Sequence, residues 1–318
     1  MKKKSSRSCE KAVVAVIDIV LISMIILLAI GSITMWAIPY IERQKAINST
    51  QFISHQFEVF NSLLLEVCKE GENSSRCFPF YINDGEVDLD CTGDMLVIWY
   101  SLDPKINFTV NNISDGDEVF DISFNMEVDI ERVNYYTLLD SGTEEPGDAI
   151  PYSNDRSKWR IYTRESINKG RGIKIELFLE EGMPKGQIWA FYPGRLRFSF
   201  PTSEGDFAVE AIGGGIIRGE GDSADLSSSI PFYRINNALV IRCIQMNFST
   251  DIRSICGKGM HIFTITNNKT SILENQKVYW IYAEMHGENE KLKILSSQSA
   301  DLILLHSICT ISLQEENR

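Results

Sequence analysis

The chain has 318 residues, 44% of them hydrophobic, and a formal net charge of −12. This length allows one large domain or two small ones and is ample for a hydrophobic core. The acidic balance argues against nucleic acid as a partner, because proteins that bind nucleic acid present basic patches.

The first predicted element is an apolar run at residues 12–38, which follows a basic leader at residues 1–11. About 20 apolar residues cross the hydrocarbon core of a bilayer as a helix, so the run predicts a transmembrane helix. Cleaved secretory signals have shorter apolar cores of about 7–15 residues. Five Lys and Arg residues precede the run, which predicts a cytoplasmic N-terminus and an extracellular location for the bulk of the chain. The sequence therefore predicts a single-pass protein of the cell membrane, with the membrane as its first partner.

One charge, Asp18, interrupts the apolar run. A carboxylate at the centre of a membrane helix costs roughly 2.5–3.5 kcal/mol, and less near the end of the helix, where Asp18 lies. Two interpretations stay open. Asp18 pairs with a cation on a neighbouring helix or subunit, or it is an interfacial or protonated side chain without a partner.

Residues 39–70 predict an amphipathic stalk helix, with Pro39 at a kink or in a new first turn. Its apolar positions recur at steps of four and three: Ile53, Phe57, Phe60, Leu64 and Val67. The two helices together would reach about 80 Å if they were continuous. This stripe packs on neighbouring subunits or on the protein's own globular domain. The bulky aromatics and the shortness of the stripe favour the second alternative.

At residues 78–314 the apolar periodicity changes to two. Short segments rich in Val, Ile, Phe, Tyr and Thr are separated by turn residues, and no long helical pattern interrupts them. This pattern predicts a mainly β fold, an antiparallel β-sandwich ectodomain built as one large or two small sandwiches. Residues 140–158 are rich in Gly, Pro, Asp and Ser and predict a linker or a surface loop.

Six cysteines follow the membrane run, an even number in a predicted oxidising compartment: Cys68, Cys77, Cys91, Cys243, Cys256 and Cys309. Cys68 and Cys77 bracket a short polar loop, and Cys243 and Cys256 bracket another. We expect disulfides Cys68–Cys77 and Cys243–Cys256, with Cys91–Cys309 as a third. The alternative is that some of these residues are buried thiols.

Six Asn-x-Ser/Thr sequons also lie beyond the membrane run: Asn48, Asn73, Asn107, Asn112, Asn247 and Asn268. Such sequons accept N-glycans in secreted proteins. Their number exceeds what chance predicts in this Asn- and Ser-rich chain and favours a glycosylated surface protein.

No motif in the chain names a chemistry. The four histidines are scattered, and the chain lacks a Gly-x-Ser-x-Gly elbow, a Walker loop and a His-Glu-x-x-His helix. It also lacks the Cys/His spacing of a zinc site. The sequence therefore predicts a non-enzymatic protein with no metal and no cofactor.

Acidic residues cluster in three places, which calcium could use if several oxygens converged. One cluster alternates along a predicted strand, and two lie in turns: Asp84, Glu86, Asp88 and Asp90; Asp115, Asp117 and Glu118; Glu220, Asp222 and Asp225. None matches an EF-hand. A solvated acidic edge, which blocks unwanted strand pairing, is the favoured interpretation.

The segment from Lys11 to Asp18, KAVVAVID, followed by IVLISMIILLAI, resembles the N-terminus of archaeal type IV pilin-like and archaellin-like proteins, with their class III signal peptides. Those proteins often have Lys/Arg-Ala-Val-Ser-Pro-Val-Ile-Gly before a long apolar helix. Val14-Ala15 stand here in place of Ser-Pro, and Asp18 in place of Gly. The stretches 36–76 and 213–234 also resemble a group of archaeal pilin-like surface proteins.

The resemblance implies processing by a prepilin peptidase after Lys11-Ala12, with Val13 as the mature first residue. It further implies a cell-surface protein whose helix packs with copies of itself or with other pilin-like subunits, while a β-rich head faces outward. The alternative is a monomeric, single-pass adhesion or ligand-binding ectodomain that never polymerises.

Overall fold

The structure is a computed structural model, and eleven ranges of the chain are described. They are residues 4–90, 95–114, 119–138, 144–163, 172–180, 182–203, 205–213, 215–220, 232–249, 253–286 and 291–314. Within these ranges the backbone alone is described at residues 4–18, 112–114, 144–148, 216–218, 220, 291–292, 294 and 314.

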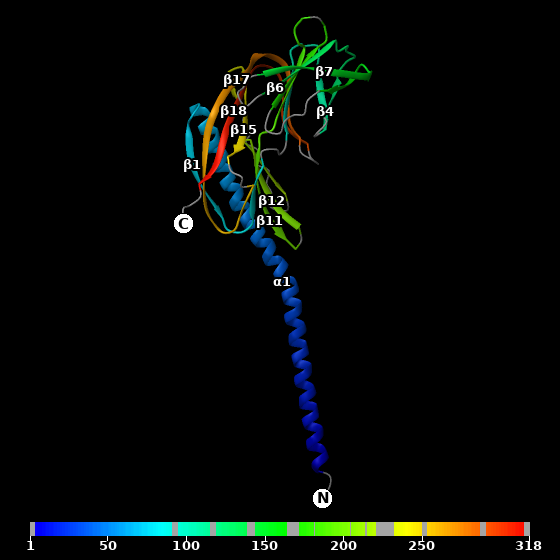
Figure 1. Cartoon of the computed structure of the whole chain (residues 1–318). Helices are drawn as coiled ribbons and strands as arrows, with labels where there is room; N and C mark the ends of the chain where they lie inside the picture. The colour runs from blue at the N-terminus through cyan, green and yellow to red at the C-terminus, as the bar shows by residue number, and fades with distance from the viewer. Residues whose placement is uncertain are drawn as a thin grey trace.

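A single helix, α1 (Lys4–Glu70), contains both predicted helices. Its 67 residues make a rod about 100 Å long. Pro39 lies inside the rod, and the helix does not end there. The helix stops before Gly71, whose φ of 103° suits a residue without a side chain. In Figure 1 the blue, N-terminal half of α1 extends away from the rest of the molecule, and its other half enters the β-rich head.

Eighteen strands follow the helix among the described residues, and they confirm the mainly β prediction. They are β1 (Ser75–Ile82), β2 (Glu86–Asp90), β3 (Met95–Ser101), β4 (Phe108–Ser114), β5 (Val119–Phe124), β6 (Arg132–Leu138), β7 (Glu144–Asp155), β8 (Lys158–Tyr162), β9 (Gly172–Phe178), β10 (Gly186–Phe191), β11 (Arg195–Thr202), β12 (Gly205–Ile212), β13 (Ile216–Glu220), β14 (Phe232–Ile235), β15 (Ala238–Phe248), β16 (Ser254–Cys256), β17 (Gly259–His286) and β18 (Lys291–Gln314).

The strands form two sheets. The larger has 13 strands in the order β14-β15-β18-β17-β3-β10-β9-β6-β7-β8-β5-β4, with β1 added beside β17. The smaller has the order β13-β12-β11-β2-β16. Neighbouring strands are antiparallel except β15 and β18, which run parallel. The long strands β17 and β18 extend along much of the head and join its parts (Figure 1).

The prediction of a loop at 140–158 was wrong, because β7 lies there and pairs with β6 and β8. Ladder hydrogen bonds on both sides outweigh the turn-forming residues Pro146, Gly147 and Pro151. Two of the short apolar segments, residues 261–268 and 277–285, are parts of the single strand β17. Register shifts, such as the one between Asn267 and Lys269, absorb the polar stretch between them.

The apolar stripe of α1 lies in the core of the head. Its five residues, from Ile53 to Val67, are at most 1% exposed. They pack between strands of the two sheets, with side chains such as Phe80 and Phe263 on one side and Leu196 and Val209 on the other. This packing confirms the interpretation that the stripe contacts the protein's own globular domain. Much of the predicted stalk is therefore a core element of the head.

Two further apolar cores use the two faces of the large sheet. On one face, β3, β9 and β10 pack against side chains of β4, β5 and β8, so the sheet folds over on itself. On the other face, β3 and β10 pack against β15, β17 and β18. The head is thus built from packed β layers, with the C-terminal half of α1 inserted at one end.

Buried His306 on β18 predicts a loss of stability in acid. It is 6% exposed, and its ring centroid lies 5.3 Å from that of Phe191. Burial, with a smaller contribution from the charge of Lys269, lowers the pKa of His306 to about 4. The unfolded chain takes up this proton near pH 6.5. We therefore expect His306 to lower the free energy of unfolding by about 3 kcal/mol as pH falls from 6.5 to 4.

Urea unfolding at pH 7 and pH 4 measures this effect. Between the two pH values, the free energy of unfolding of the variant His306→Leu should fall by about 3 kcal/mol less than that of the wild type. The control His55→Leu changes a side chain that is 76% exposed and should keep the wild-type difference. Equal losses in the wild type and His306→Leu would contradict the prediction.

Candidate functional site

The segment 19–38 of α1 is the most unusual surface of the molecule. Its large apolar side chains are exposed by 51–83%, as at Leu21 and Met35. By length and composition this helix can cross a membrane, with a mean hydropathy of 2.5 over its most apolar 18 residues. None of that stretch is buried against the head. A helix in the core of a soluble protein of the same composition would be covered.

The exposed and packed parts of α1 meet near residue 42. The hydroxyl of Ser203, after β11, donates to Glu42 at 3.0 Å, and Ala46 is the first fully buried apolar residue of the helix. Just before this junction Trp36 and Tyr40 stack, with ring centroids 5.7 Å apart. Paired aromatics at the end of an apolar helix are typical of a membrane–water interface.

The predicted processing residues Lys11, Ala12 and Val13 and the intramembrane Asp18 lie in α1. Their side chains fall outside the described part of the structure. Cys91 falls outside the described residues altogether, as do Asp115, Asp117, Glu118, Asp222 and Asp225.

The two local disulfides predicted from spacing are not formed. Cys68 is buried and Cys77 is exposed, and Cys243 is likewise buried while Cys256 is exposed. In each pair the two cysteines lie in consecutive elements of the chain, and one side chain points into the core while the other points to the surface. Instead, the sulfur of Cys68 lies 3.4 Å from that of Cys309, 241 residues away in the chain.

The sequons differ in exposure. Asn48, Asn73 and Asn268 are exposed, whereas Asn107 and Asn247 are half-buried. The amide of Asn107 donates to the hydroxyl of Tyr282 at 3.1 Å. The backbone of Asn112 lies in β4, and its side chain is outside the described set.

The sequence predicted that the acidic segment is a solvated sheet edge. This prediction was wrong for β2, because β2 lies between β11 and β16. Val87 and Leu89 point into the core, while the acidic side chains lie on the other face. Arg195 contacts Asp90 at 3.3 Å, which offsets part of the acidic charge. In the described ranges, no group of three His, Cys, Asp or Glu is placed to hold a metal ion.

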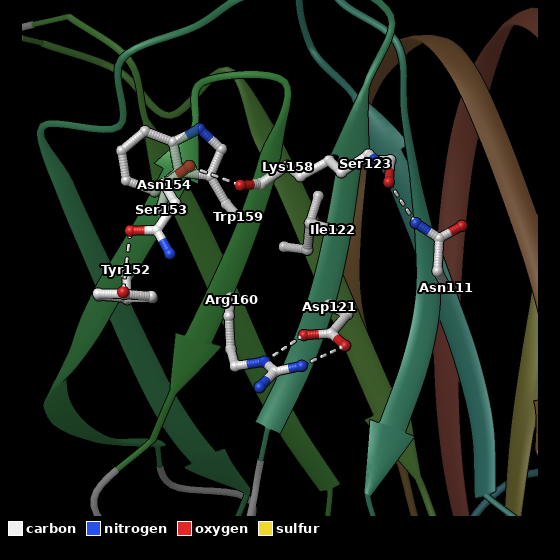
Figure 2. A pocket seen from close by; sticks show the side chains of 10 residues that line it. All are labelled: Asn111, Asp121, Ile122, Ser123, Tyr152, Ser153, Asn154, Lys158, Trp159 and Arg160. Carbon is white, nitrogen blue, oxygen red and sulfur yellow. Dashed lines mark hydrogen bonds and ion pairs between the residues drawn. The ribbon is translucent and has the colours of Figure 1, made fainter.

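One shallow, open pocket of about 470 Å³ lies over β4, β5, β7 and β8 (Figure 2). Most of its lining residues are polar, and two carry aromatic rings: Asn111, Asp121, Ile122, Ser123, Tyr152, Ser153, Asn154, Lys158, Trp159 and Arg160. Arg160 of β8 and Asp121 of β5 both line the pocket and form a bidentate ion pair, with Nε–Oδ1 at 2.6 Å and Nη2–Oδ2 at 2.9 Å.

The chemistry of this pocket suits binding better than catalysis. Its lining holds no His or Cys. The hydrogen bonds to Asp121 raise the pKa of Arg160, so the guanidinium keeps its proton. Tyr152 donates to Asn154 at 2.9 Å (Figure 2). The pocket therefore offers polar groups and two rings to a ligand, with no arranged nucleophile or general base.

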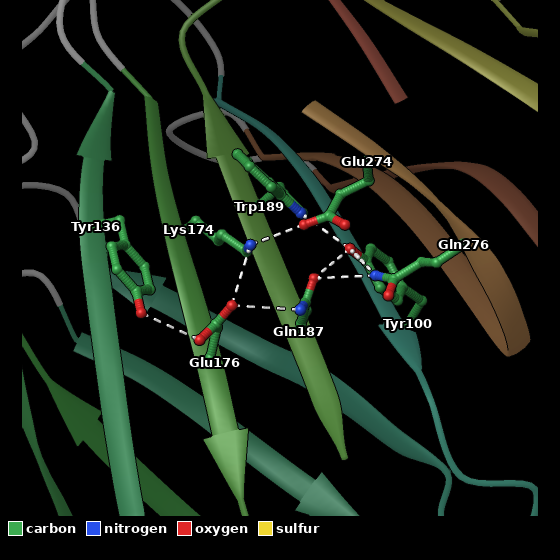
Figure 3. Close-up of polar contacts among 8 residues, drawn as sticks. All are labelled: Tyr100, Tyr136, Lys174, Glu176, Gln187, Trp189, Glu274 and Gln276. Carbon is green, nitrogen blue, oxygen red and sulfur yellow. Dashed lines mark hydrogen bonds and ion pairs between the residues drawn. The ribbon is translucent and has the colours of Figure 1, made fainter. Parts of the chain in front are cut away.

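A second polar cluster lies on the face of the large sheet formed by β3, β6, β9, β10 and β17 (Figure 3). Its centre is Lys174, whose ammonium contacts Glu176 at 3.0 Å and Glu274 at 2.7 Å. Burial lowers the pKa of Lys174, but the two carboxylates outweigh burial, and the net pKa is raised. Tyr100, Tyr136, Gln187, Trp189 and Gln276 complete the hydrogen-bonded network.

Replacing Lys174 by methionine would leave two carboxylates near each other, both only 12–13% exposed. We expect the free energy of unfolding to fall by about 3 kcal/mol, because a largely buried charge loses its partner. Lys185→Met is the matched control. Its pair with Asp103, at 3.3 Å, is more exposed and should cost less than about 1 kcal/mol. If urea unfolding showed the same fall in the free energy of unfolding for both variants, the buried charge of Lys174 would not have the expected effect on stability.

Comparison of the chain with family models, curated proteins and solved structures finds no match in any of the three.

Proposed function

We propose that this protein is a non-enzymatic, membrane-anchored surface protein of pilin-like architecture. Segment 12–38 of α1 anchors the chain in the membrane or assembles with equivalent helices of other subunits. The β-rich head is displayed outside the cell, and the leader stays in the cytoplasm. A prepilin peptidase cleaves after Ala12 in this proposal.

A single observation carries the proposal. One continuous helix is divided into an apolar half, whose described side chains from Ile19 onward are not buried against the head, and a half that is built into the core of the head. Leaving that much apolar surface in water is strongly unfavourable, at about 25 cal/mol per Å². A bilayer or a bundle of like helices would cover it. Type IV pilin-like proteins, which the N-terminus resembles, pack their apolar helices together in a filament core while their β-rich heads face outward.

The second candidate function is a monomeric, ligand-binding ectodomain on the same anchor. The observation that favours it is the polar pocket with Tyr152 and Trp159, at a distance from α1. A filament subunit does not require such a pocket. The two candidates share the membrane anchor and differ in whether the helices of several copies associate.

Labelling of intact cells with a membrane-impermeant maleimide tests the orientation. Cys77 is exposed on the head, and Cys9 precedes the apolar run. We expect modification at Cys77 before lysis and at Cys9, if the leader is retained, only after permeabilisation. Labelling of Cys9 alone in intact cells would overturn the proposed orientation.

Sequencing of the mature N-terminus, with shearing of the cells, separates the two candidates. A start at Val13 and recovery of the protein in sheared, sedimentable material support the pilin-like function. An intact leader and a detergent-soluble monomer support the ligand-binding ectodomain.

A further inference from the structure

We propose that Cys68 and Cys309 are partners in a disulfide that covalently joins the anchoring helix to the last strand of the head. Cys68 lies in the final turn of α1, and Cys309 lies near the end of β18. The link therefore connects the first and last elements of the described chain.

Geometry is the first argument for this pair. The two sulfurs are 3.4 Å apart, and both residues belong to the same apolar core, at 2% and 0% exposure. On the N-terminal side of Cys68 the helix is held in place by the buried side chains of Leu64 and Val67. A pair of thiols so close in a packed core needs only a small movement to bond.

The polar surroundings supply a second argument. Arg242 of β15, only 6% exposed, donates from Nη1 to the carbonyl of Cys68 at 2.8 Å and to the hydroxyl of Ser307 at 3.1 Å. The hydrogen bond from Cys309 lowers the pKa of Cys68, burial opposes this effect, and Ser307 and Arg242 add to it. The same bond raises the pKa of Cys309. The surroundings thus favour ionisation of Cys68 beside a second sulfur, the arrangement that thiol–disulfide exchange uses.

The oxidant in this proposal is a protein or small-molecule disulfide. One cysteine thiolate attacks a sulfur of the oxidant, and the other sulfur of the oxidant leaves as a thiolate. The second cysteine then attacks the mixed disulfide and releases the remaining thiol. The two cysteines lose two protons and two electrons, and the oxidant gains them as two thiols. Because both sulfurs are buried, the exchange takes place before α1 is fully enclosed in the head.

This link closes a loop of 241 residues, far longer than either local pair predicted from sequence. Cross-links that close long loops restrict the unfolded chain most. The link also ties the helix to the strand that would otherwise separate from it under a pull along α1. This last role rests on the proposed anchoring function, whereas the pairing itself does not.

Peptide mapping of the full chain tests the pairing. Thiols of the detergent-solubilised protein are blocked with N-ethylmaleimide at lysis, and the protein is digested with trypsin without reduction. We expect the peptides 46–69 and 294–318 to be joined and unmodified at their cysteines. The same mapping is repeated on reduced, denatured protein that is refolded with oxidised and reduced glutathione.

The two samples separate the pairing from the cellular location. If the pair forms on refolding but is reduced in cells, the pairing stands and the extracellular location of the head is contradicted. Two alkylated cysteines after refolding, or a bond from either one to another cysteine, would overturn the proposal.

Thermal unfolding gives an independent readout. Cys68→Ala and Cys309→Ala should each lower the Tm by about 5–10 °C more than the control Cys243→Ala, another buried thiol. The double variant should be close to either single variant, because one substitution already removes the link. Reductant present during unfolding should lower the Tm of the wild type and leave the variants unchanged. Additive losses that ignore reductant would indicate packing alone and overturn the proposal.

Discussion

Phe60→Ala is expected to lower the free energy of unfolding by about 4 kcal/mol, which corresponds to a fall in Tm of about 10 °C. Phe60 is fully buried at the centre of the stripe of α1. Its ring lies 5.9 Å from that of Phe78 and 6.3 Å from that of Phe263, between centroids. Truncation removes these contacts and leaves a cavity between the helix and the strands. Thermal and urea unfolding of the full chain in detergent measure the loss.

Phe52→Ala is the matched control, since it makes the same change in the same helix at a side chain that is 42% exposed. Its effect should lie within about 0.5 kcal/mol of zero. If both variants lost stability equally, or if Phe60→Ala lost less than about 1 kcal/mol, the stripe would not be part of the core.

Removal of residues 1–38 is expected to move the protein from the membrane pellet to the supernatant of a high-speed spin. The deleted segment carries most of the exposed large apolar side chains of α1, and the junction at Glu42 with Ser203 is retained. Because the deleted stretch is not buried against the head, the Tm should change by less than about 2 °C. Sedimentation without detergent and thermal unfolding measure the two outcomes.

The control is a chain that lacks only residues 1–11, which keeps the whole apolar run. It should still sediment with membranes, because the run and not the basic leader supplies the hydrophobic free energy. A truncated head that still sediments would assign the attachment to the head, and a Tm lowered by more than about 5 °C would contradict the separation of α1 into two halves.

Much of the fold could be predicted from local patterns. The steps of four and three from Ile53 to Val67 identify a helix face, and that face is buried as its bulky side chains suggest. Alternation identified most strands. Segment 144–155 could not be identified, because its extended state depends on hydrogen bonds to β6 and β8 and not on its own residues.

The cysteine partners were beyond such patterns for the same reason. Spacing favours Cys68 with Cys77, but the helix ends at Glu70 and β1 then sends Cys77 to the surface. Cys309 reaches Cys68 only through the pairing of β18 with β15 and β17. The pocket likewise combines residues from β4, β5, β7 and β8, which no linear motif unites.

The place of α1 in the head also sets an order of events during synthesis. The helix leaves the ribosome first, but the strands that cover its aromatic face include β16, β17 and β18, which are made last. Folding dominated by such distant contacts is slow, and incomplete chains expose apolar surface. The nascent chain therefore needs protection of Phe57 and Phe60 until its final strands emerge. A chain that stops before β17 would have a helix with no complete core to enter.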